Sequence, residues 1–159
     1  NFLCIVLDNG VTAMTGHQPH PGTGLTVDGV TLNKVLIEDI VRGFGVTCEI
    51  ADPFENKAVA EKICELLREP GVKVLVLRRE CALVSGRKKR QKRRVYVDQS
   101  LCRGDTCGCG RFCTSVWGCP GNIWDREADK AAIDEAVCAG CGVCASLCPA
   151  GAIVVEGED

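Results

Sequence analysis

The most informative stretch of this 159-residue sequence is Cys138-Ala-Gly-Cys141-Gly-Val-Cys144-Ala-Ser-Leu-Cys148-Pro149. Three cysteines at two-residue gaps, followed by a fourth before a proline, form a run that is typical of [4Fe-4S] cluster loops. Thiolates at this spacing hold one cubane from a tight turn, while the fourth cysteine serves a second cluster. A zinc site typically uses two C-x2-C pairs, so zinc leaves the third cysteine and the Cys-Pro step unexplained.

A second, less regular copy of this run precedes it. Residues 98–104 (Asp-Gln-Ser-Leu-Cys-Arg-Gly) match residues 134–140 (Asp-Glu-Ala-Val-Cys-Ala-Gly), and Cys119-Pro120 matches Cys148-Pro149. The repetition predicts two halves related by a pseudo-twofold axis, each with a strand, a cluster loop and a short helix. Since the fourth cysteine of such a run serves the other cluster, we expect one cluster to be held by Cys138, Cys141, Cys144 and Cys119.

The spacing leaves two alternatives open for the other cluster. Besides Cys148 it needs three thiolates, and the first copy contains four: Cys102, Cys107, Cys109 and Cys113. Cys102 opens the repeat and Cys113 precedes the Cys-Pro step, so we expect both to be ligands. For the middle place we favour Cys109, because a glycine precedes it as in the second copy, and Cys107 is the alternative. If the extra thiol displaced Cys148, this cluster would have only local ligands.

The composition limits the classes of protein to which the chain can belong. Hydrophobic residues make up 46% and charged residues 25%, which is ordinary for a packed chain and excludes global disorder. No apolar run approaches the roughly 18 residues of a membrane span, so we expect no membrane partner. The 19 Lys and Arg against 21 Asp and Glu give a net charge of −2, which does not favour nucleic acid.

The cysteine content indicates a cellular compartment. Nine of the 13 cysteines lie between residues 102 and 148, and no basic, apolar secretory signal opens the sequence. We therefore expect metal-bound thiolates in a reducing cytoplasm, anaerobic or microaerobic, with disulfides as the alternative. The four remaining cysteines are expected to be small buried hydrophobic residues: Cys4, Cys48, Cys64 and Cys81.

Residues 1–84 alternate between strand and helix patterns, which predicts an α/β domain with a parallel sheet and right-handed crossovers. Three strands are few for an open sheet, so we expect preceding sequence to complete the domain. Asp52 is expected to be the N-cap of the second helix. The expected strands are 2–7, 46–51 and 72–78, and the expected helices are 31–42 and 53–69. The second helix is expected to turn inward Ala58, Ala60, Ile63, Leu66 and Leu67.

Residues 85–94, Ser-Gly-Arg-Lys-Lys-Arg-Gln-Lys-Arg-Arg, separate this part from the cysteine-rich one. A run of like charges does not pack, so we interpret it as a solvated linker between a domain of residues 1–84 and one of residues 95–159. The same composition occurs in nucleic-acid-binding patches and in surfaces that dock acidic partners. No aromatic residue that could stack on bases is interleaved with these charges.

A long loop rich in glycine, proline and threonine follows the first expected strand, from Asp8-Asn9-Gly10 to Gly24. Asn-Gly after a strand is also a hairpin signal, but no alternating return strand follows, and a loop of this length is commonly functional. α/β sheets bind phosphorylated ligands at the carboxyl ends of their strands. The oxygens of Asp8 and Asn9, with nearby glycine and threonine backbone, suit a Mg²⁺-diphosphate.

The sequence Leu-Asp-Asn-x-x-Thr-Ala-Met-Thr-Gly-x-Gln-Pro-His-Pro, which begins at Leu7, resembles the end of the thiamine diphosphate motif in the alpha subunit of indolepyruvate ferredoxin oxidoreductases. The resemblance covers essentially the whole chain and implies part of a thiamine-diphosphate-binding α/β domain, followed by a small α+β bacterial-type ferredoxin domain with two [4Fe-4S] clusters. It implies that Mg²⁺ is bound by the side chain of Asn9 and the carbonyl of Val11, with Thr12, Thr15 and Gly16 near the diphosphate. The Gly-Asp-Gly half of the motif is absent, so we expect weak thiamine diphosphate binding by this chain alone.

The same resemblance implies a reaction and partners. The reaction is oxidative decarboxylation of an aryl 2-oxoacid, such as indolepyruvate, with coenzyme A to an acyl-CoA. Electrons then pass through the two clusters to an external ferredoxin, and a second (beta) subunit is the expected partner. No residue of this chain is expected to be the catalytic acid or base. Two alternatives follow in order: a stand-alone electron carrier with a vestigial α/β half, and a nucleic-acid-binding module built around residues 87–94.

Overall fold

The computed structural model of this chain describes residues 1–81, 84 and 93–157. The chain divides into two compact units, Asn1–Ser85 and Gly86–Asp159. Most of the basic segment expected to be a linker, residues 85–92, lies outside the described residues. Its last residue, Arg94, does not belong to a linker, because it is the first residue of a strand that pairs with Glu156.

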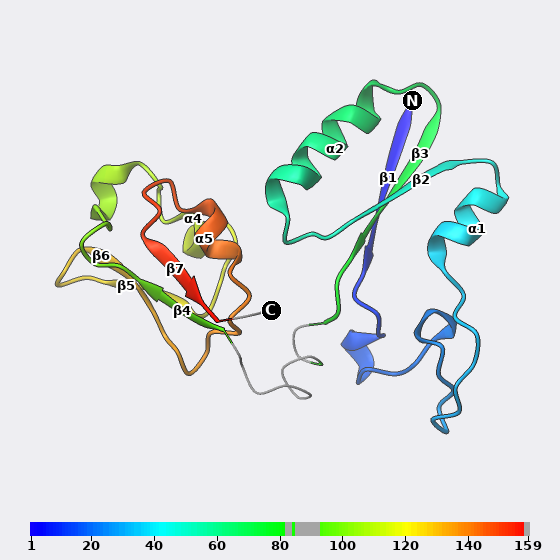
Figure 1. The fold of residues 1–159 in the computed structure, drawn as a ribbon, viewed down its shortest axis with the longest axis horizontal. Helices are drawn as coiled ribbons and strands as arrows, with labels where there is room; N and C mark the ends of the chain where they lie inside the picture. Colours follow the sequence, from blue (N-terminus) through cyan, green and yellow to red (C-terminus); the bar gives the residue numbers. More distant parts are fainter. Residues whose placement is uncertain (82–83, 85–92, 158–159) are drawn as a thin grey trace. The chain divides into compact units, whose positions relative to one another are not determined.

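The first unit is built on a three-stranded parallel sheet with β3 in the centre (Figure 1). Val74 of β3 is opposite Cys4 on one side and Cys48 on the other. The parallel sheet expected from the sequence is therefore confirmed, and the Asn9-Gly10 hairpin is not formed, because β1 pairs with β3. The strands are β1 (Phe2–Asp8), β2 (Thr47–Ala51) and β3 (Val72–Arg78).

The two helices of this unit, α1 (Ile37–Gly43) and α2 (Asn56–Arg68), lie on either side of the strands in Figure 1. Ile37 and Val41 of α1 pack on the core that contains Val74 and Val76. Lys73 points to the other face, because side chains alternate along a strand, and its ammonium donates to the carbonyls of Glu69 and Gly71 at the end of α2. Each face of the sheet is thus covered by one helix.

The first helix is shorter than the sequence pattern predicts. Residues 31–36 are not helical, because their backbone groups bond within the preceding loop. The N–H of Leu32 donates to Gly24 and that of Val35 to Pro21, so both apolar side chains are exposed. Apolar spacing alone placed these residues in the helix, and the loop competes for their hydrogen bonds.

The second helix also begins later than expected. Asp52 is not its N-cap: one carboxylate oxygen accepts from the N–H of Phe54 and the other pairs with Arg79. The helix starts at Asn56 with Glu55 before it, and its buried residues are Val59 and Leu66. The expected inward face was therefore wrong in part: Ile63 is half-buried, but Ala58, Ala60 and Leu67 are exposed, as is Cys64.

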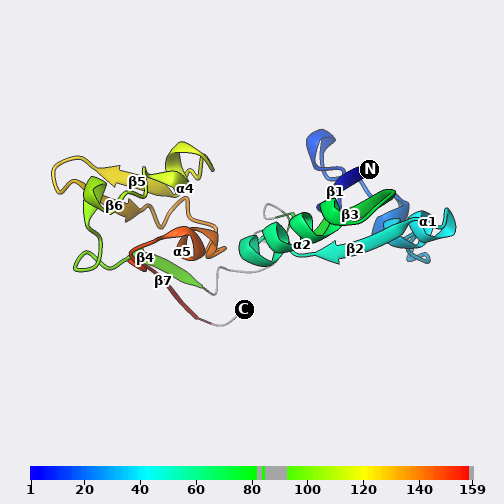
Figure 2. The ribbon, with the colours of Figure 1, turned by 90° about the horizontal axis from the view of Figure 1, so that it is seen from above.

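The second unit consists of two antiparallel strand pairs and short helices (Figure 2). The first strand, β4, pairs with the last, β7, while β5 pairs with β6. Each repeat predicted from the sequence supplies one strand to each pair, so the two halves are interlocked. The elements are β4 (Arg94–Val97), η3 (Gly104–Cys107), α4 (Phe112–Ser115), β5 (Asn122–Asp125), β6 (Lys130–Ile133), α5 (Val143–Leu147) and β7 (Ile153–Glu156).

Hydrogen bonds repeat between the two halves as the sequence does. The carbonyl of Asp98 accepts from the N–H of Cys102 at 3.0 Å, and that of Asp134 accepts from the N–H of Cys138 at 2.9 Å. The Asp98 carboxylate accepts from the N–H of Ser100, and the Asp134 carboxylate accepts from the N–H of Ala136. Both turns therefore hold the first cysteine of their run in the same way.

A close backbone approach in this unit makes Gly104 sensitive to substitution. Gly104 has φ +59°, and a methyl group there would collide with the carbonyl oxygen of Asp129. We expect Gly104→Ala to cost about 3 kcal/mol of unfolding free energy, from the left-handed backbone and the overlap together. Gly108→Ala is the control, because Gly108 has φ +72° but open space around it, and it should cost about 1 kcal/mol.

This comparison is measured by urea denaturation of the iron-loaded chain, followed by the fluorescence of Trp117 and Trp124, which both lie in this unit. Equal losses in the two variants would show that the approach of Asp129 to Gly104 contributes nothing.

Candidate metal centre and cofactor loop

A pocket in the second unit collects thiols from both repeats. Its wall contains Cys102, Cys107 and Cys109 of the first repeat together with Cys148 of the second. The remaining wall is largely apolar, with Val97, Phe112, Leu147 and Ile153 among its residues. Cys144, which the sequence pattern assigns to the other cluster, also lines it. The side chain of Cys113, expected to be a further ligand here, lies outside what the structure describes.

The first repeat also lies close to the second repeat around Cys138. Gly121, two residues after Cys119, lies so close to Cys138 that a methyl group on it would come within 2.9 Å of the Cys138 Cα. The N–H of Asp134 donates to the carbonyl of Gly121 at 2.9 Å. The Cys-Pro segment of the first repeat therefore lies beside the opening cysteine of the second, as cross-ligation requires.

Backbone N–H groups point at several of the sulfur atoms. Cys109 accepts from the N–H of Arg111, Cys138 from that of Gly140, and Cys148 from that of Ala152, each at 3.4 Å. The backbone and thiol hydrogen bonds of Cys109 lower the pKa of Cys107 below its usual value. Such bonds stabilise negative charge on sulfur, which is the form of cysteine that binds metals.

The donor set fits an iron–sulfur cluster. All the titratable metal-ligating side chains on the pocket wall are thiols, the ligands preferred by these clusters. None of the twelve cysteines with described side chains forms a disulfide. Among the described residues, no three His, Cys, Asp or Glu side chains converge on the position of a single metal ion. A cubane places its ligands further apart than one ion does, because irons and sulfides lie between them.

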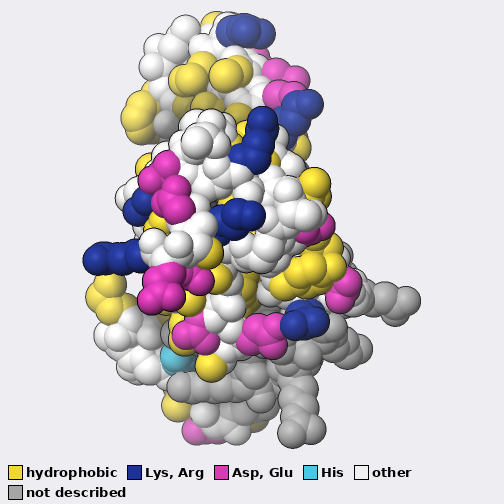
Figure 3. Space-filling view, turned by 90° about the vertical axis from the view of Figure 1, so that its left-hand side faces the viewer, with side chains coloured by type: hydrophobic (Ala, Val, Ile, Leu, Met, Phe, Trp, Pro, Cys, Tyr) yellow, Lys and Arg dark blue, Asp and Glu magenta, His cyan; other side chains and the backbone are white. Residues whose placement is uncertain are grey.

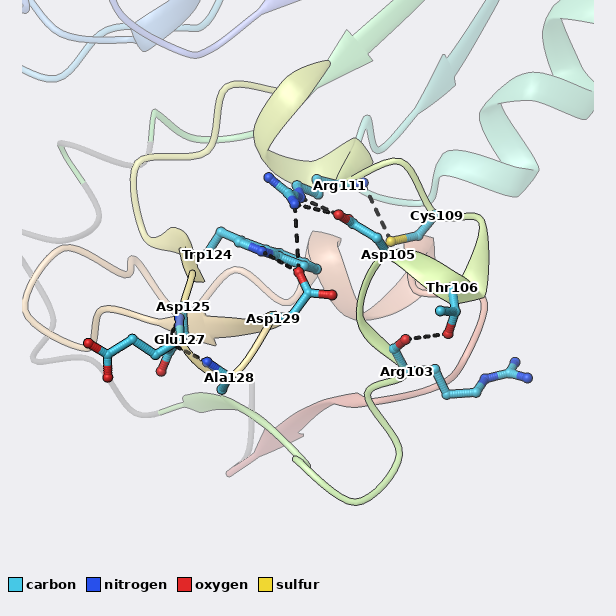
Figure 4. A network of polar contacts seen from close by, with 10 residues as sticks. All are labelled: Arg103, Asp105, Thr106, Cys109, Arg111, Trp124, Asp125, Glu127, Ala128 and Asp129. Carbon is cyan, nitrogen blue, oxygen red and sulfur yellow. Dashed lines mark hydrogen bonds and ion pairs between the residues drawn. The ribbon is translucent and has the colours of Figure 1, made fainter.

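An ion-pair network supports the loop between Cys102 and Cys113 (Figure 4). The Arg111 guanidinium binds both carboxylate oxygens of Asp105, at 3.0 and 2.6 Å, and stacks 4.0 Å from the Trp124 ring centre. Asp129 lies 3.9 Å from the same guanidinium and accepts from the Trp124 indole N–H. The network joins the cysteine loop to the β5–β6 strand pair.

In the first unit, the loop expected to bind a cofactor begins at the carboxyl end of β1. The side-chain oxygen of Asn9 accepts from the N–H of Val11, and the Asn9 carbonyl accepts from the N–H of Cys81 after β3. Thr12 forms an isolated bridge with Gln18, and the Thr15 hydroxyl donates to the Gln18 side chain. Gly16 has a positive φ, and two short helices, η1 (Ala13–Thr15) and η2 (Pro21–Thr23), lie within the loop.

This loop fits a Mg²⁺-diphosphate in part. It brings Asn9, Val11, Thr12, Thr15 and Gly16 together on one segment above the sheet edge and offers neutral oxygens. Asp8, whose charge also suits a cation, is already engaged: its oxygens accept from Arg78 and from the N–H of Gly10. A carboxylate ligand for such a metal would therefore come from outside this loop.

A buried ion-pair cluster lies beneath the loop. Arg78 at the end of β3 donates to both Glu38 oxygens, at 2.8 and 2.6 Å, and to Asp8 at 2.7 Å. Glu38 is 5% exposed, and its hydrogen bonds with Arg78 outweigh burial and lower its pKa to about 2. Burial tends to raise the pKa of Asp8, but bonds from Arg78 and Gly10 leave it below its ordinary value. The cluster fixes α1 and the start of the loop to the sheet.

Sequence reasoning missed the residues that support both sites. Arg78 and Glu38 are 40 residues apart, and only the parallel strand order brings them together. Arg111 and Asp105 are close in sequence, but Arg111 has a positive φ that sequence patterns for arginine do not indicate. The one available signal was the presence of two opposite charges, Asp105 and Arg111, within the same short cysteine loop.

One face of the described surface mixes both charge signs. The face in Figure 3 shows Lys and Arg side chains interspersed with Asp and Glu and with apolar groups. In the part of the chain that the structure describes, no helix is long and apolar enough to cross a membrane.

Comparisons with known proteins agree with this geometry. Residues 1–77 match the thiamine pyrophosphate enzyme, C-terminal TPP binding domain, and residues 131–154 match the 4Fe-4S binding domain. The chain is 41% identical over 161 residues to the indolepyruvate oxidoreductase subunit IorA of Pyrococcus horikoshii, covering 99% of this chain and 24% of that protein. It is 38% identical over 154 residues to IorA of Archaeoglobus fulgidus, covering 96% of this chain and 24% of the relative.

The chain thus spans about a quarter of the length of these relatives. An uncharacterized ferredoxin of Methanocaldococcus jannaschii is 39% identical over 67 residues, which cover 40% of this chain and 97% of that protein. No solved structure matches the chain.

Proposed function

Because this chain belongs to the family of indolepyruvate oxidoreductase IorA subunits, we propose that it is part of a thiamine-diphosphate-dependent 2-oxoacid:ferredoxin oxidoreductase. In that enzyme it would supply both the cofactor loop and the unit that carries electrons. The proposed reaction is oxidative decarboxylation of an aryl 2-oxoacid with coenzyme A, with a ferredoxin as electron acceptor. A second subunit and the remaining part of this one complete the enzyme. The observation that carries the proposal is the convergence of thiols from both repeats on one pocket.

Two [4Fe-4S] clusters are proposed in the second unit. One would be held by Cys138, Cys141, Cys144 and Cys119, and the other by Cys102, Cys109 or Cys107, Cys113 and Cys148. When bound, such clusters take up and release single electrons. The apolar wall of the pocket limits the access of water to the sulfur atoms, and the N–H groups of Arg111, Gly140 and Ala152 offset their negative charge.

Mg²⁺ and thiamine diphosphate are proposed for the loop after β1. Asn9 and Val11 would donate oxygens to the metal, and Thr12, Thr15 and Gly16 would lie beside the diphosphate. When bound, thiamine diphosphate supplies the electron sink for decarboxylation. The chain contributes the orientation of Asn9, which is fixed by its bond from Val11 and by the pairing of its carbonyl with Cys81. Groups that contact the 2-oxoacid are expected in the rest of the subunit.

A calorimetric titration with thiamine diphosphate and Mg²⁺ tests this part of the proposal. We expect little or no binding by the 159-residue chain alone and clear binding once the complete subunit pair is present. In the complete pair, Asn9→Ala should weaken binding at least about tenfold, because a metal ligand is lost. Asn33→Ala is the matched control, since Asn33 is an exposed loop asparagine of the same unit. Equal affinity in the two variants would remove Asn9 from the site.

A stand-alone electron carrier is the second candidate. It is favoured by the ferredoxin relative, because 40% of this chain covers 97% of that protein. The two candidates are separated by the same titration: iron-loaded protein that binds no thiamine diphosphate in either state favours the carrier.

A further inference from the structure

Arg111 faces the pocket that we propose holds the cluster of the first repeat and Cys148. It lines this pocket together with Cys107 and Cys109, and its own N–H donates to the Cys109 sulfur. Figure 4 shows its side chain extended over Trp124 toward Asp105 and Asp129. A charged pair of opposite sign, Arg111 and Asp105, is therefore held beside the thiols by fixed contacts.

Arg111 also occupies an unusual place in the backbone. It precedes α4 with φ +54°, a left-handed conformation that few residues other than glycine adopt. The equivalent position before α5 is Gly142, with φ +77°. The two helices carry Cys113 and Cys144 at the same place, one residue after their first, so the second repeat shows which residue this turn favours.

The second repeat nevertheless places a guanidinium at the corresponding point. A methyl group on Gly142 would come within 2.9 Å of an Arg93 nitrogen and 3.6 Å of its guanidinium carbon. A side chain at residue 142 would therefore point toward Arg93, and the Arg111 side chain extends from the corresponding position before α4. Both cluster loops carry a guanidinium at the start of their helix, although it comes from different parts of the sequence.

We propose that the charges of Arg111 and Asp105 together set the reduction potential of one cluster. This is the cluster bound by Cys102, Cys109 or Cys107, Cys113 and Cys148. The inference rests on the proposed function, because it requires that a cluster be bound there. Reduction adds one negative charge to a cluster, and the nearby charges of the protein set its cost. Arg111 favours the reduced form, while Asp105 opposes it.

The strain at Arg111 has a direct bearing on this proposal. A glycine would form the turn with less strain, but it would lack the guanidinium beside the pocket. The left-handed arginine is kept in place by the fork of bonds to Asp105 and by the Trp124 ring. Strained residues of this kind are concentrated at functional sites.

The test compares Arg111→Gly and Asp105→Asn in the 159-residue chain reconstituted anaerobically with iron and sulfide. Arg111→Gly keeps the turn and the N–H that bonds Cys109, and removes only the side chain. We expect it to reduce the equilibrium constant for reduction of one cluster about tenfold, which is ~59 mV for a one-electron couple. Asp105→Asn should shift the same cluster in the opposite direction, because it removes the negative charge. An EPR-monitored redox titration measures both.

Potential shifts of opposite sign in the two variants would distinguish an electrostatic effect from a change in the structure of the loop. Both variants break the same ion pair, so a structural effect would shift the potential in the same direction in each. Equal-sign shifts, or unchanged potentials with full iron content, would overturn the proposal. Arg94→Gln is the control for lost charge, since Arg94 is exposed and pairs with Glu135, and it should leave both clusters unchanged.

Iron analysis distinguishes this failure from that of the proposed function. A wild-type chain that takes up no iron contradicts the cluster proposal itself. If Arg111→Gly alone lost iron, Arg111→Lys would decide: with its charge kept and bidentate geometry lost, it should hold iron at nearly the wild-type potential. A marked shift in that variant would count against the charge of residue 111 as the cause.

Discussion

Replacing Cys141 with serine is expected to remove about half of the iron from a chain that otherwise binds about eight irons, four in each of two cubanes. Cys141 lies in the middle of the regular cysteine run, and in the proposed ligand sets its thiolate would belong to one cluster only. The other cluster would depend on Cys148 and the first repeat. Iron and sulfide analysis after anaerobic reconstitution measures the loss, and EPR after dithionite reduction counts the remaining paramagnetic centres.

Double variants turn this result into a test of cross-ligation. If Cys119 and Cys141 hold the same cluster, the double alanine variant should still retain about half of the iron. The Cys141 and Cys148 double variant should lose nearly all of it, because each belongs to a different cluster. Cys64→Ser is the control, since Cys64 is exposed on α2 of the other unit. The reverse order of the two double variants would show that each repeat holds its own cluster.

Replacing Arg78 with methionine is expected to destabilise the first unit by about 3 kcal/mol. Arg78 is the shared partner of Glu38 and Asp8, and its loss leaves two largely buried carboxylates without compensation. Removing one partner of a buried pair typically costs 3–5 kcal/mol, and the lower figure applies because Arg78 itself is one-third exposed. Urea denaturation followed by far-UV circular dichroism measures the loss. The tryptophan transition provides an internal control, because both tryptophans lie in the second unit.

The pH dependence gives this prediction a second readout. In the wild-type chain, Glu38 has a pKa lowered to about 2, so its stabilising contribution is present above its ordinary pKa and is lost as pH falls toward 2. Without Arg78, burial favours the protonated carboxyl. The variant should therefore regain stability as pH falls from 7 to about 5, where the wild-type chain changes little. Parallel pH profiles would show that Arg78 does not compensate these carboxylates.

The sequence predicted the regular parts of the fold well. β3 was expected at 72–78 and is found there, because its apolar residues, interrupted only by Lys73, are typical of a central parallel strand. The largest errors in element boundaries concern helix starts. Leu32 and Val35 have helical spacing, but their N–H groups bond to the loop, and Asp52 resembles an N-cap but pairs with Arg79. In each case a contact distant in sequence overrides the local signal.

The candidate site divides in the same way. Cysteine spacing identified the thiols, because cluster geometry requires them at fixed intervals. It could not choose between Cys107 and Cys109, and the structure places both on the pocket wall. The charged residues around them, Arg111 and Asp105, were not foreseen, because sequence patterns for arginine do not indicate the left-handed backbone that Arg111 adopts.

The pairing of β4 with β7 has a consequence for how such proteins are assembled in evolution. Arg94 and Glu156 are opposite each other in this pair, so the chain enters and leaves the unit at neighbouring points. A module with adjoining ends can be grafted onto another polypeptide with little disturbance to either. The ferredoxin relative is matched over 97% of its length by 40% of this chain, so a protein of that size exists without the remaining part of this chain. A unit with this strand pairing is therefore suited to fusion with an unrelated domain.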